Sequence, residues 1–278
     1  MPLVIPHHLH RLAVAVSDVD AGAAWLGRVL GATSLLASMP QPQDLPAADG
    51  EGVGGADMRF LWVGRYPAVL LAGGAVRRFL DRHGPGLQSL AWEVDDNWEV
   101  EHIVRDRGIG VISVNIEGRF FFMDPRDTHG VLMEWCDGQM PRDPGQMEPA
   151  PGVVDVIDLA WVSAVVADAD ATASWMADLV ETRRVEGNPI GPEDLERTVD
   201  VGIGDVTVRL VTPRASESRY ARTLQSGPRV HSFAVRVPRI DAALAALEAE
   251  GIATTHRYGA LAATDPATTL GLQLEWTE

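Results

Sequence analysis

Cysteine is almost missing from this sequence, which has only Cys136 among its 278 residues. A single cysteine excludes an internal disulfide framework and any metal site built from several thiolates, and it fits a reducing compartment. Long apolar runs are missing too. No stretch approaches the roughly 18 consecutive apolar residues of a membrane span, and the N-terminus lacks a basic region followed by an apolar run. We therefore expect a cytoplasmic protein that does not enter a membrane.

Basic residues are scarce relative to acidic ones. Lys and Arg together number 23 against 39 Asp and Glu, which gives a formal net charge of −16. Nucleic acid binding needs clustered positive charge along a phosphate backbone, so this balance predicts no nucleic acid partner. With 46% hydrophobic residues the composition is that of a globular protein, and the length is enough for two ordinary domains. A small organic molecule is the expected ligand.

What the sequence does have is an internal repeat. The phrase DPRDTHGVLMEW at 124–135 returns as DPATTLGLQLEW at 265–276, and VSDVDA at 16–21 returns as VADADA at 166–171. Self-similarity at a nearly constant offset is the signature of duplication. Both copies of the longer phrase place a glutamate, Glu134 or Glu275, in an apolar and aromatic strand. A carboxylate is costly to bury there unless it is paired or used, so both are candidates for function.

Each half divides into two similar modules. A strand ending in aspartates, apolar residues at three-and-four spacing and a closing glycine predict a helix after Asp18 that stops at Gly31. The same reasoning predicts helices over 97–107, 170–180 and 240–250. About three strands follow each helix. The sequence therefore predicts an α+β chain of four modules.

The modules pair along the chain into two predicted domains. Modules at about 8–75 and 86–137 make a first domain, 1–137, and modules at about 154–214 and 228–278 make a second, 153–278. Between them, 138–152 carries four prolines, which favour extended backbone, and is predicted to be a linker. The segment 39–56, rich in proline and glycine, is too long for a simple hairpin and is expected to be a lid or a disordered loop.

The chain resembles the vicinal oxygen chelate superfamily, which includes glyoxalase I, methylmalonyl-CoA epimerase and the extradiol dioxygenases. The residues that carry the resemblance are FLDRHGPGL at 79–87, AWEVDD at 91–96 and GVLME at 130–134, which look like the second module of the epimerase. The resemblance implies four βαβββ modules paired into two cup-shaped half-barrel domains. It also implies a divalent metal inside a cup.

The positions that hold the metal in that family carry unsuitable residues here. By the resemblance, these positions are Arg11, Val69, Ser89 and Glu134 in the first cup, and Trp161, Arg209, Ser232 and Glu275 in the second. A divalent ion needs about three protein donors, and an arginine would place permanent positive charge where the ion belongs. We therefore expect no cofactor. In the second cup, Arg209 is expected to face Glu275 and to satisfy its carboxylate.

An alternative strand register gives a different donor set. Strand side chains alternate between faces, so a bulge would turn the neighbouring residues inward. The first cup would then hold His10, Gln88 and Glu134. The second would hold Asp158, His231 and Glu275. A histidine with two oxygen donors can hold iron, zinc or manganese, so this register predicts a metal site.

The first cup carries the leading functional hypothesis. Glu134 would exchange a proton with the substrate, Arg11 would supply charge complementarity, and Ser89 would donate a hydrogen bond, as in a lyase or isomerase. Substrate contacts are expected from His129, in the loop before the last strand, and from Gln88, Trp92 and His10. The alternatives are a metal-dependent extradiol-type dioxygenase and a metal-free protein that binds or sequesters a small molecule or drug. A monomer or homodimer is expected.

Overall fold

The structure is a computed structural model that describes residues 3–35, 56–114, 120–138, 150–185 and 194–278. Residues 39–55, which are nearly all of the predicted lid, lie outside the described residues. So do residues 139–149, which are most of the predicted linker. No helix in the described ranges is long and apolar enough to cross a membrane.

The first half contains β1 (Leu9–Ala15), α1 (Val19–Leu30), β2 (Thr33–Ser34), β3 (Ala56–Val63), β4 (Tyr66–Gly73), the 3-10 turn η4 (Gly74–Val76), α2 (Arg77–His83), β5 (Gly86–Glu93), α3 (Asn97–Asp106), β6 (Val111–Val114), β7 (Phe120–Met123) and β8 (Met133–Cys136).

The second half repeats this order with β9 (Asp158–Val165), α4 (Ala169–Leu179), β10 (Thr182–Arg184), β11 (Glu196–Ile203), β12 (Val206–Pro213), α5 (Ala221–Gln225), β13 (Arg229–Arg236), α6 (Ile240–Ala249), β14 (Thr254–Tyr258), β15 (Leu261–Thr264), the 3-10 turn η5 (Pro266–Thr268) and β16 (Leu274–Thr277).

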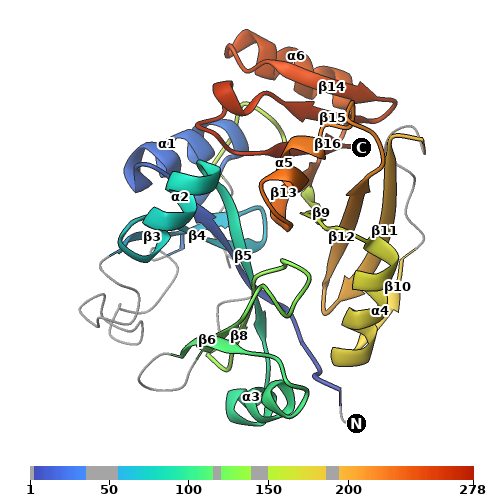
Figure 1. The fold of residues 1–278 in the computed structure, drawn as a ribbon. Helices are drawn as coiled ribbons and strands as arrows, with labels where there is room; N and C mark the ends of the chain where they lie inside the picture. The colour runs from blue at the N-terminus through green and yellow to red at the C-terminus, as the bar shows by residue number, and fades with distance from the viewer. Residues whose placement is uncertain (1–2, 36–55, 115–119, 139–149, 186–193) are drawn as a thin grey trace. The chain divides into compact units, whose positions relative to one another are not determined.

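The strands form two eight-stranded mixed sheets, one from each half (Figure 1). Their orders are β2-β3-β4-β1-β5-β8-β7-β6 and β10-β11-β12-β9-β13-β16-β15-β14, so the second sheet repeats the topology of the first. Within each module the first strand pairs in parallel with the last, as β1 does with β4 and β5 with β8. The other strand pairs of each module are antiparallel. The predicted α+β class, with four modules in two cup-shaped half-barrels, is confirmed.

Contacts divide the chain into two compact units that do not follow the two halves. Unit 1 comprises Met1–His10, Gln88–Gln139 and Trp161–His231, and unit 2 comprises Arg11–Leu87, Met140–Ala160 and Ser232–Glu278. Each unit therefore takes most of one module from the first half and most of one from the second. The two units are described separately below.

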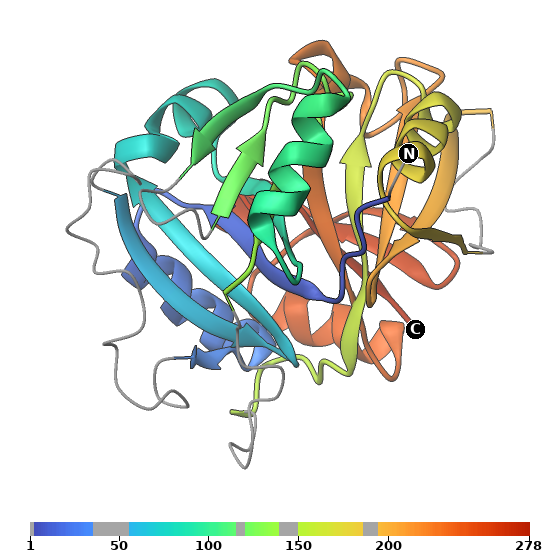
Figure 2. The same cartoon turned by 90° about the horizontal axis from the view of Figure 1, so that it is seen from below.

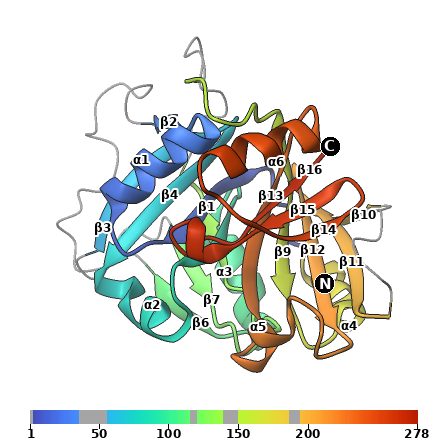
Figure 3. The ribbon, with the colours of Figure 1, turned by 90° about the horizontal axis from the view of Figure 1, so that it is seen from above.

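In unit 2, helix α1 begins and ends where the sequence predicts. The Asp18 side chain accepts hydrogen bonds from the backbone N–H groups of Asp20 and Ala21, a cap worth about 0.5–2 kcal/mol. Gly31 ends the helix with a left-handed φ of 67°, which favours glycine. The buried face of α1 packs on β3 and β4 (Figure 3).

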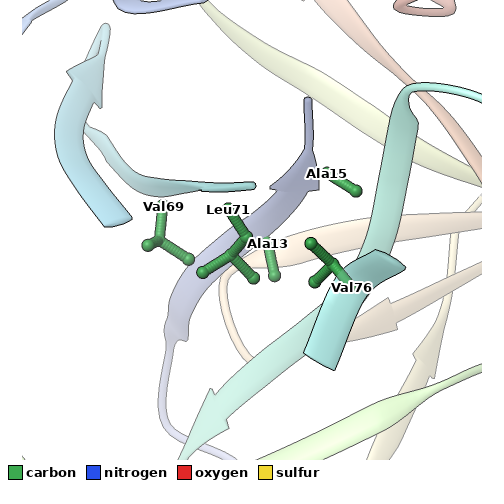
Figure 4. Close-up of a cluster of buried hydrophobic side chains, with 5 residues drawn as sticks. All are labelled: Ala13, Ala15, Val69, Leu71 and Val76. Carbon is green, nitrogen blue, oxygen red and sulfur yellow. The ribbon is translucent and has the colours of Figure 1, made fainter. Parts of the chain in front are cut away.

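The opposite face of the β1–β4 pair is apolar. Gly22 of α1 lies against Leu70 and Val16, so the alternate residues of β1 and β4 point away from this helix. These residues form a buried cluster, drawn in Figure 4, of Ala13, Ala15, Val69, Leu71 and Val76. Phe79 and Leu80 of α2 pack against it. The side of the first module that would line its cup is therefore largely filled by hydrophobic side chains.

Unit 1 repeats these arrangements. Asp96 and Asp168 cap α3 and α4 as Asp18 caps α1, and α4 packs along β11 and β12 (Figure 2). On the other face of β9 and β12, Val165 and Val211 form a cluster with Tyr220, and Leu224 of α5 packs against it.

Two short helices differ from the sequence-based expectation. Neither α2 nor α5 was predicted, and they occupy matching places after β4 and β12. Both lack a side-chain cap, and α2 has no buried residue. They therefore lack the length of the four longer helices and the aspartate cap that begins three of them, α1, α3 and α4.

Candidate active site

One face of the β5–β8 pair in unit 1 gathers several polar side chains. The parallel register sets Ala91 beside Glu134 and Glu93 beside Cys136. Because strand side chains alternate, Ser89 shares the face of Ala91 and Glu93. The face therefore carries a serine, two glutamates and the single cysteine.

Glu134 and Ser89 are both buried, with exposed fractions of 1% and 0%. The Cys136 thiol donates a long hydrogen bond of 3.6 Å to Oε1 of Glu134. The hydroxyl of Ser89 makes no hydrogen bond to any described residue. A buried hydroxyl without a partner costs about 1–3 kcal/mol, so it marks a place where a ligand or water would bind.

Aromatic side chains from β7 complete this face. Phe122 lies opposite Glu134 and Phe120 opposite Cys136 in the antiparallel register of β7 and β8. Their rings are 5.9 Å apart in an edge-to-face arrangement, and both are partly exposed. The glutamate therefore lies beside an apolar, aromatic surface that suits a small organic ligand.

The corresponding face of β13 and β16, in unit 2, has the same register but a different hydrogen bond. Ala234 lies beside Glu275 as Ala91 lies beside Glu134. Here, however, Ser232 Oγ donates to Glu275 Oε1 at 2.7 Å. The serine and glutamate of the second half thus satisfy each other, whereas Ser89 does not bond Glu134.

Gln88 and Trp92 lie on the opposite face of β5 from Ser89. Trp92 is paired with Trp135 in the β5–β8 register and is fully buried, and Gln88 has the same parity as Trp92. The structure therefore does not bring these two residues together with Glu134. Their predicted contact with substrate loses its geometric basis.

Arg11 and His10 lie at the start of β1, on opposite faces of that strand. The register of β1 with β4 is regular from Leu12 to Ala15, and Arg11 has the parity of the cluster residue Ala13. His10 has the parity of Leu12. Within β1, this alternation turns Arg11 and not His10 to the face away from α1.

His129, the predicted substrate contact in the loop before β8, packs on α4 within unit 1. Its Nδ1 lies 3.1 Å from the hydroxyl of Thr172, and its ring centroid lies 5.4 Å from that of Trp175. His129 also has a φ of 53°, in the left-handed region. These contacts give His129 a packing role, and its contact with a substrate stays a prediction.

Arg209, in the second cup, has a partner other than the one expected. Its Nε and Nη2 donate to the two carboxylate oxygens of Asp200 at 2.7 and 2.6 Å. The guanidinium also lies over the Trp161 ring, 3.8 Å from its centroid. The carboxylate that pairs with Arg209 within unit 1 therefore belongs to Asp200, and the expected pairing with Glu275 of unit 2 stays a prediction.

Asp200 is the residue that sequence reasoning missed, although a signal for it existed. Strands β11 and β12 flank a two-residue turn at Gly204 and Asp205, and such a turn sets residue 200 opposite residue 209. The observed register is this one.

The residues of the alternative metal sets have other partners. Within unit 1, His231 Nδ1 lies 3.3 Å from Thr223 Oγ1, and its ring lies edge-on to Tyr220. Within unit 2, Asp158 forms an ion pair with Arg65 at 3.3 Å.

The donors in the described ranges do not form the divalent metal site that the family resemblance implied. Among the described residues, no three His, Cys, Asp or Glu side chains lie close enough together to hold an ion. The Cys136 and Glu134 pair supplies at most two donors on its face. The position held by Arg209 carries a guanidinium committed to Asp200. We therefore derive no chemistry through a metal.

Comparisons with known proteins identify the fold. No protein-family model matches the chain, and no curated protein matches it significantly. A triple mutant of 4-hydroxymandelate synthase from Streptomyces coelicolor covers 98% of this chain and 92% of that chain, with a TM-score of 0.66 and 16% identity. The 2,3-dioxygenase LapB from Pseudomonas sp. KL28 covers 100% of this chain and 93% of that chain, with a TM-score of 0.58 and 14% identity.

A third similar structure covers half of the chain. Methylmalonyl-CoA epimerase from Mycobacterium tuberculosis aligns with 45% of this chain and 89% of that chain at 24% identity, with a TM-score of 0.41 that is too low to support a conclusion. The chain therefore shares its four-module fold with 4-hydroxymandelate synthase and LapB, which align with nearly its whole length.

Proposed function

We propose that this protein is a small-molecule enzyme of the lyase or isomerase kind, in which Glu134 transfers a proton. The observation that carries the proposal is the contrast between two serine–glutamate pairs of equal register. Ser232 is hydrogen bonded to Glu275, whereas Ser89 is buried beside Glu134 without a partner in the described ranges. The Ser232 hydroxyl is therefore already engaged by its glutamate, whereas the Ser89 hydroxyl, in the first pair along the chain, can still donate to a ligand.

The chemistry follows from the two groups. A buried carboxylate can remove a proton from a carbon next to a carbonyl, and the electrons then move onto the carbonyl oxygen to give an enolate. A hydroxyl that already points to that face can donate a hydrogen bond to this oxygen as its charge develops. General base catalysis contributes about 10²–10⁴-fold to a rate, and one such donor about 10²–10³-fold.

The substrate class follows from the surroundings of Glu134. Phe120 and Phe122 make the neighbouring surface apolar and aromatic, which favours a small organic carbonyl compound over a highly charged one. Arg11 belongs to unit 2, and the charge contribution expected of it stays a prediction, which the variant Arg11→Met tests separately.

Deuterium exchange tests the proposal without knowledge of the product. The protein is incubated in D2O with a panel of small 2-oxo acids, aryl ketones and acyl thioesters, and loss of the proton next to the carbonyl is followed by NMR. The wild-type protein is expected to catalyse exchange in at least one compound. Glu134→Gln is expected to slow that exchange by about 100-fold or more, and Ser89→Ala by roughly tenfold or more.

Glu275→Gln is the matched control, because Glu275 has the same strand register but is bonded to Ser232. It is expected to retain exchange. If Glu275→Gln abolishes exchange while Glu134→Gln leaves it intact, the assignment to the first pair is wrong. If compounds bind but neither the wild-type protein nor the Glu275→Gln variant catalyses exchange, the protein is a binder and not an enzyme.

A dioxygenase is the second candidate, because LapB, which aligns with the whole chain, is named a 2,3-dioxygenase. This reaction requires a bound metal, so metal analysis of protein purified without chelator belongs to the same test. Iron, zinc or manganese at close to one ion per chain, lost in Glu134→Gln, would replace the proton-transfer proposal.

A further inference from the structure

Arg209, in the part of unit 1 that comes from the second half of the chain, has a guanidinium nitrogen without a described hydrogen bond. An arginine side chain offers five N–H donors in a fixed plane. In Arg209, the Nε and Nη2 nitrogens bond Asp200, but Nη1 is buried and makes no hydrogen bond to any residue in the described ranges. The whole side chain is only 4% exposed. Buried polar groups without partners are rare in folded proteins.

This donor is held in a fixed orientation. The two bonds to Asp200 prevent rotation of the guanidinium in its plane, and the Trp161 ring covers one of its faces at 3.8 Å. Asp200 and Arg209 lie directly opposite each other on β11 and β12, so the backbone register also fixes the pair. A donor that is ordered before a ligand arrives loses little freedom on binding.

The matching place in the first half shows that the fold does not require this pair. The β3–β4 hairpin has the same two-residue turn, and the residues equivalent to Asp200 and Arg209 are Phe60 and Val69, which lie opposite each other. Both belong to or contact the apolar cluster in Figure 4. A hydrophobic pair therefore satisfies this position, so the buried ion pair of the second half has no evident structural need.

We propose that Nη1 of Arg209 binds the carbonyl or amide oxygen of a neutral small molecule, in a second ligand site separate from Glu134. The charge of the ligand follows from Asp200, which already neutralises the guanidinium. An anionic ligand would bring a buried charge without a counter-charge on this pair, which is unfavourable. A neutral oxygen acceptor completes the hydrogen bonds of Arg209 at no such cost.

The direction of approach follows from the residues on the same face of the hairpin. Toward α5, the face is closed by the cluster of Val165, Val211 and Tyr220. Toward the turn, Thr207 is partly exposed, and the exposed side chain of Arg183 lies over Gly202, which is opposite Thr207. A ligand that enters from the end of the hairpin nearer the turn is therefore expected to displace Arg183, a flexible side chain.

Benzamide and benzoate are suitable probes, because they have the same shape and differ in charge. Binding is measured by ligand-observed saturation-transfer NMR on the full-length protein. Benzamide is expected to bind the wild-type protein at least about tenfold more tightly than benzoate. The double variant Asp200→Leu with Arg209→Met, which replaces the ion pair by apolar side chains, is expected to lose roughly tenfold or more of the benzamide affinity.

A further variant and a further measurement keep the result decisive. Arg209→Lys keeps a positive charge beside Asp200 but lacks the planar set of donors, and it is expected to lose benzamide affinity as the double variant does. The double variant keeps Ser89 and Glu134, and it is expected to keep the deuterium exchange of the wild-type protein. That comparison separates this proposal from the proton-transfer proposal.

Three outcomes would overturn the second site. One is unchanged benzamide affinity in a folded Arg209→Lys or double variant, with folding checked by circular dichroism. Another is tighter binding of benzoate than of benzamide. The third is a crystal structure with benzamide in which only a water molecule bonds Nη1 of Arg209.

Discussion

A single hydrogen bond distinguishes the two serine–glutamate pairs, and the proton-transfer proposal rests on this difference. In the second half, Ser232 donates to Glu275 at 2.7 Å and both groups are satisfied. In the first half, the same register leaves Ser89 without a described partner. Proteins keep such a cost of about 1–3 kcal/mol mainly where a ligand removes it. Glu134 is therefore the better candidate for chemistry.

Asp124, in the loop before β8, supports a prediction about pH. Its carboxylate accepts hydrogen bonds from the Arg126 side chain, at 2.9 Å from Nε, and from the Arg126 backbone N–H at 2.9 Å. The side-chain bond first, and the backbone bond second, hold the pKa of Asp124 below its ordinary value. A lowered pKa stabilises the fold above the ordinary pKa of about 4, and this contribution is lost as pH falls through the lowered value.

Asp124→Asn is therefore expected to lower the thermal midpoint at pH 7 by a small amount, on the order of 2 °C, because Arg126 is exposed and solvent screens the pair. The difference from the wild-type protein is expected to shrink as pH falls from 5 toward 3. Asp265→Asn is the control, since Asp265 bonds the backbone of Ala267, which has no guanidinium. A difference that stays constant over this pH range would contradict the assignment to Asp124.

At the scale of elements, the turn before β8 depends on a glycine. Gly130 has a φ of 88°, and a Cβ at this position would lie 2.5 Å from the carbonyl oxygen of Pro228. Gly108, which follows α3, has a φ of 74° but open space around its Cβ position. Both alanine variants carry the cost of a left-handed conformation, about 1–2 kcal/mol, and only Gly130→Ala adds a clash with backbone.

Urea denaturation is expected to show a loss of about 1 kcal/mol for Gly108→Ala and roughly 2–4 kcal/mol for Gly130→Ala. The difference between the two variants measures the close approach of Gly130 to Pro228. Equal losses would mean that this approach is relaxed in solution.

The sequence predicted the elements that carry strong local signals. Helix α1 was expected from Asp18 and Gly31, and those two residues cap it. The helix that begins at Asn97 also starts where predicted. Helices α2 and α5 were missed because they span seven and five residues and lack side-chain caps. Such helices form through packing against distant residues, as Phe79 of α2 packs on the cluster containing Val69, and no local pattern encodes that contact.

The candidate site was predictable in its residue types but not in its hydrogen bonds. The repeat pointed to Glu134 and the family resemblance to Ser89, and the register of β5 and β8 sets them on one face. The partner of Arg209 required the hairpin pairing, which the two-residue turn at Gly204 contains. Whether the Ser89 hydroxyl finds a hydrogen-bond partner depends on differences of tenths of an ångström in side-chain positions. A sequence pattern does not contain this information.

At the scale of the whole molecule, the repeat predicted four modules but not how contacts group them. Unit 1 joins residues of the first half, Gln88–Gln139, to residues of the second half, Trp161–His231. The contacts that join them include the Gly130–Pro228 approach and the hydrogen bond between His129 and Thr172. These are single, distant contacts without a periodic pattern, so the sequence gives no sign of them.

This grouping predicts that neither half of the chain is stable alone. A fragment of residues 1–137 would lose the part of unit 1 that follows Trp161, including the hydrogen bonds that join Val4 to Leu179 and Glu181, at 3.0 and 2.8 Å. It would also expose the apolar residues that those partners cover. Calorimetry is expected to show a thermal midpoint at least about 10 °C below that of the full chain, or no cooperative transition. Co-expression with residues 138–278 is expected to restore a soluble complex with a cooperative transition. A fragment that melts alone at the midpoint of the full chain would show that the contacts within unit 1 contribute little, and that each half folds as an independent domain.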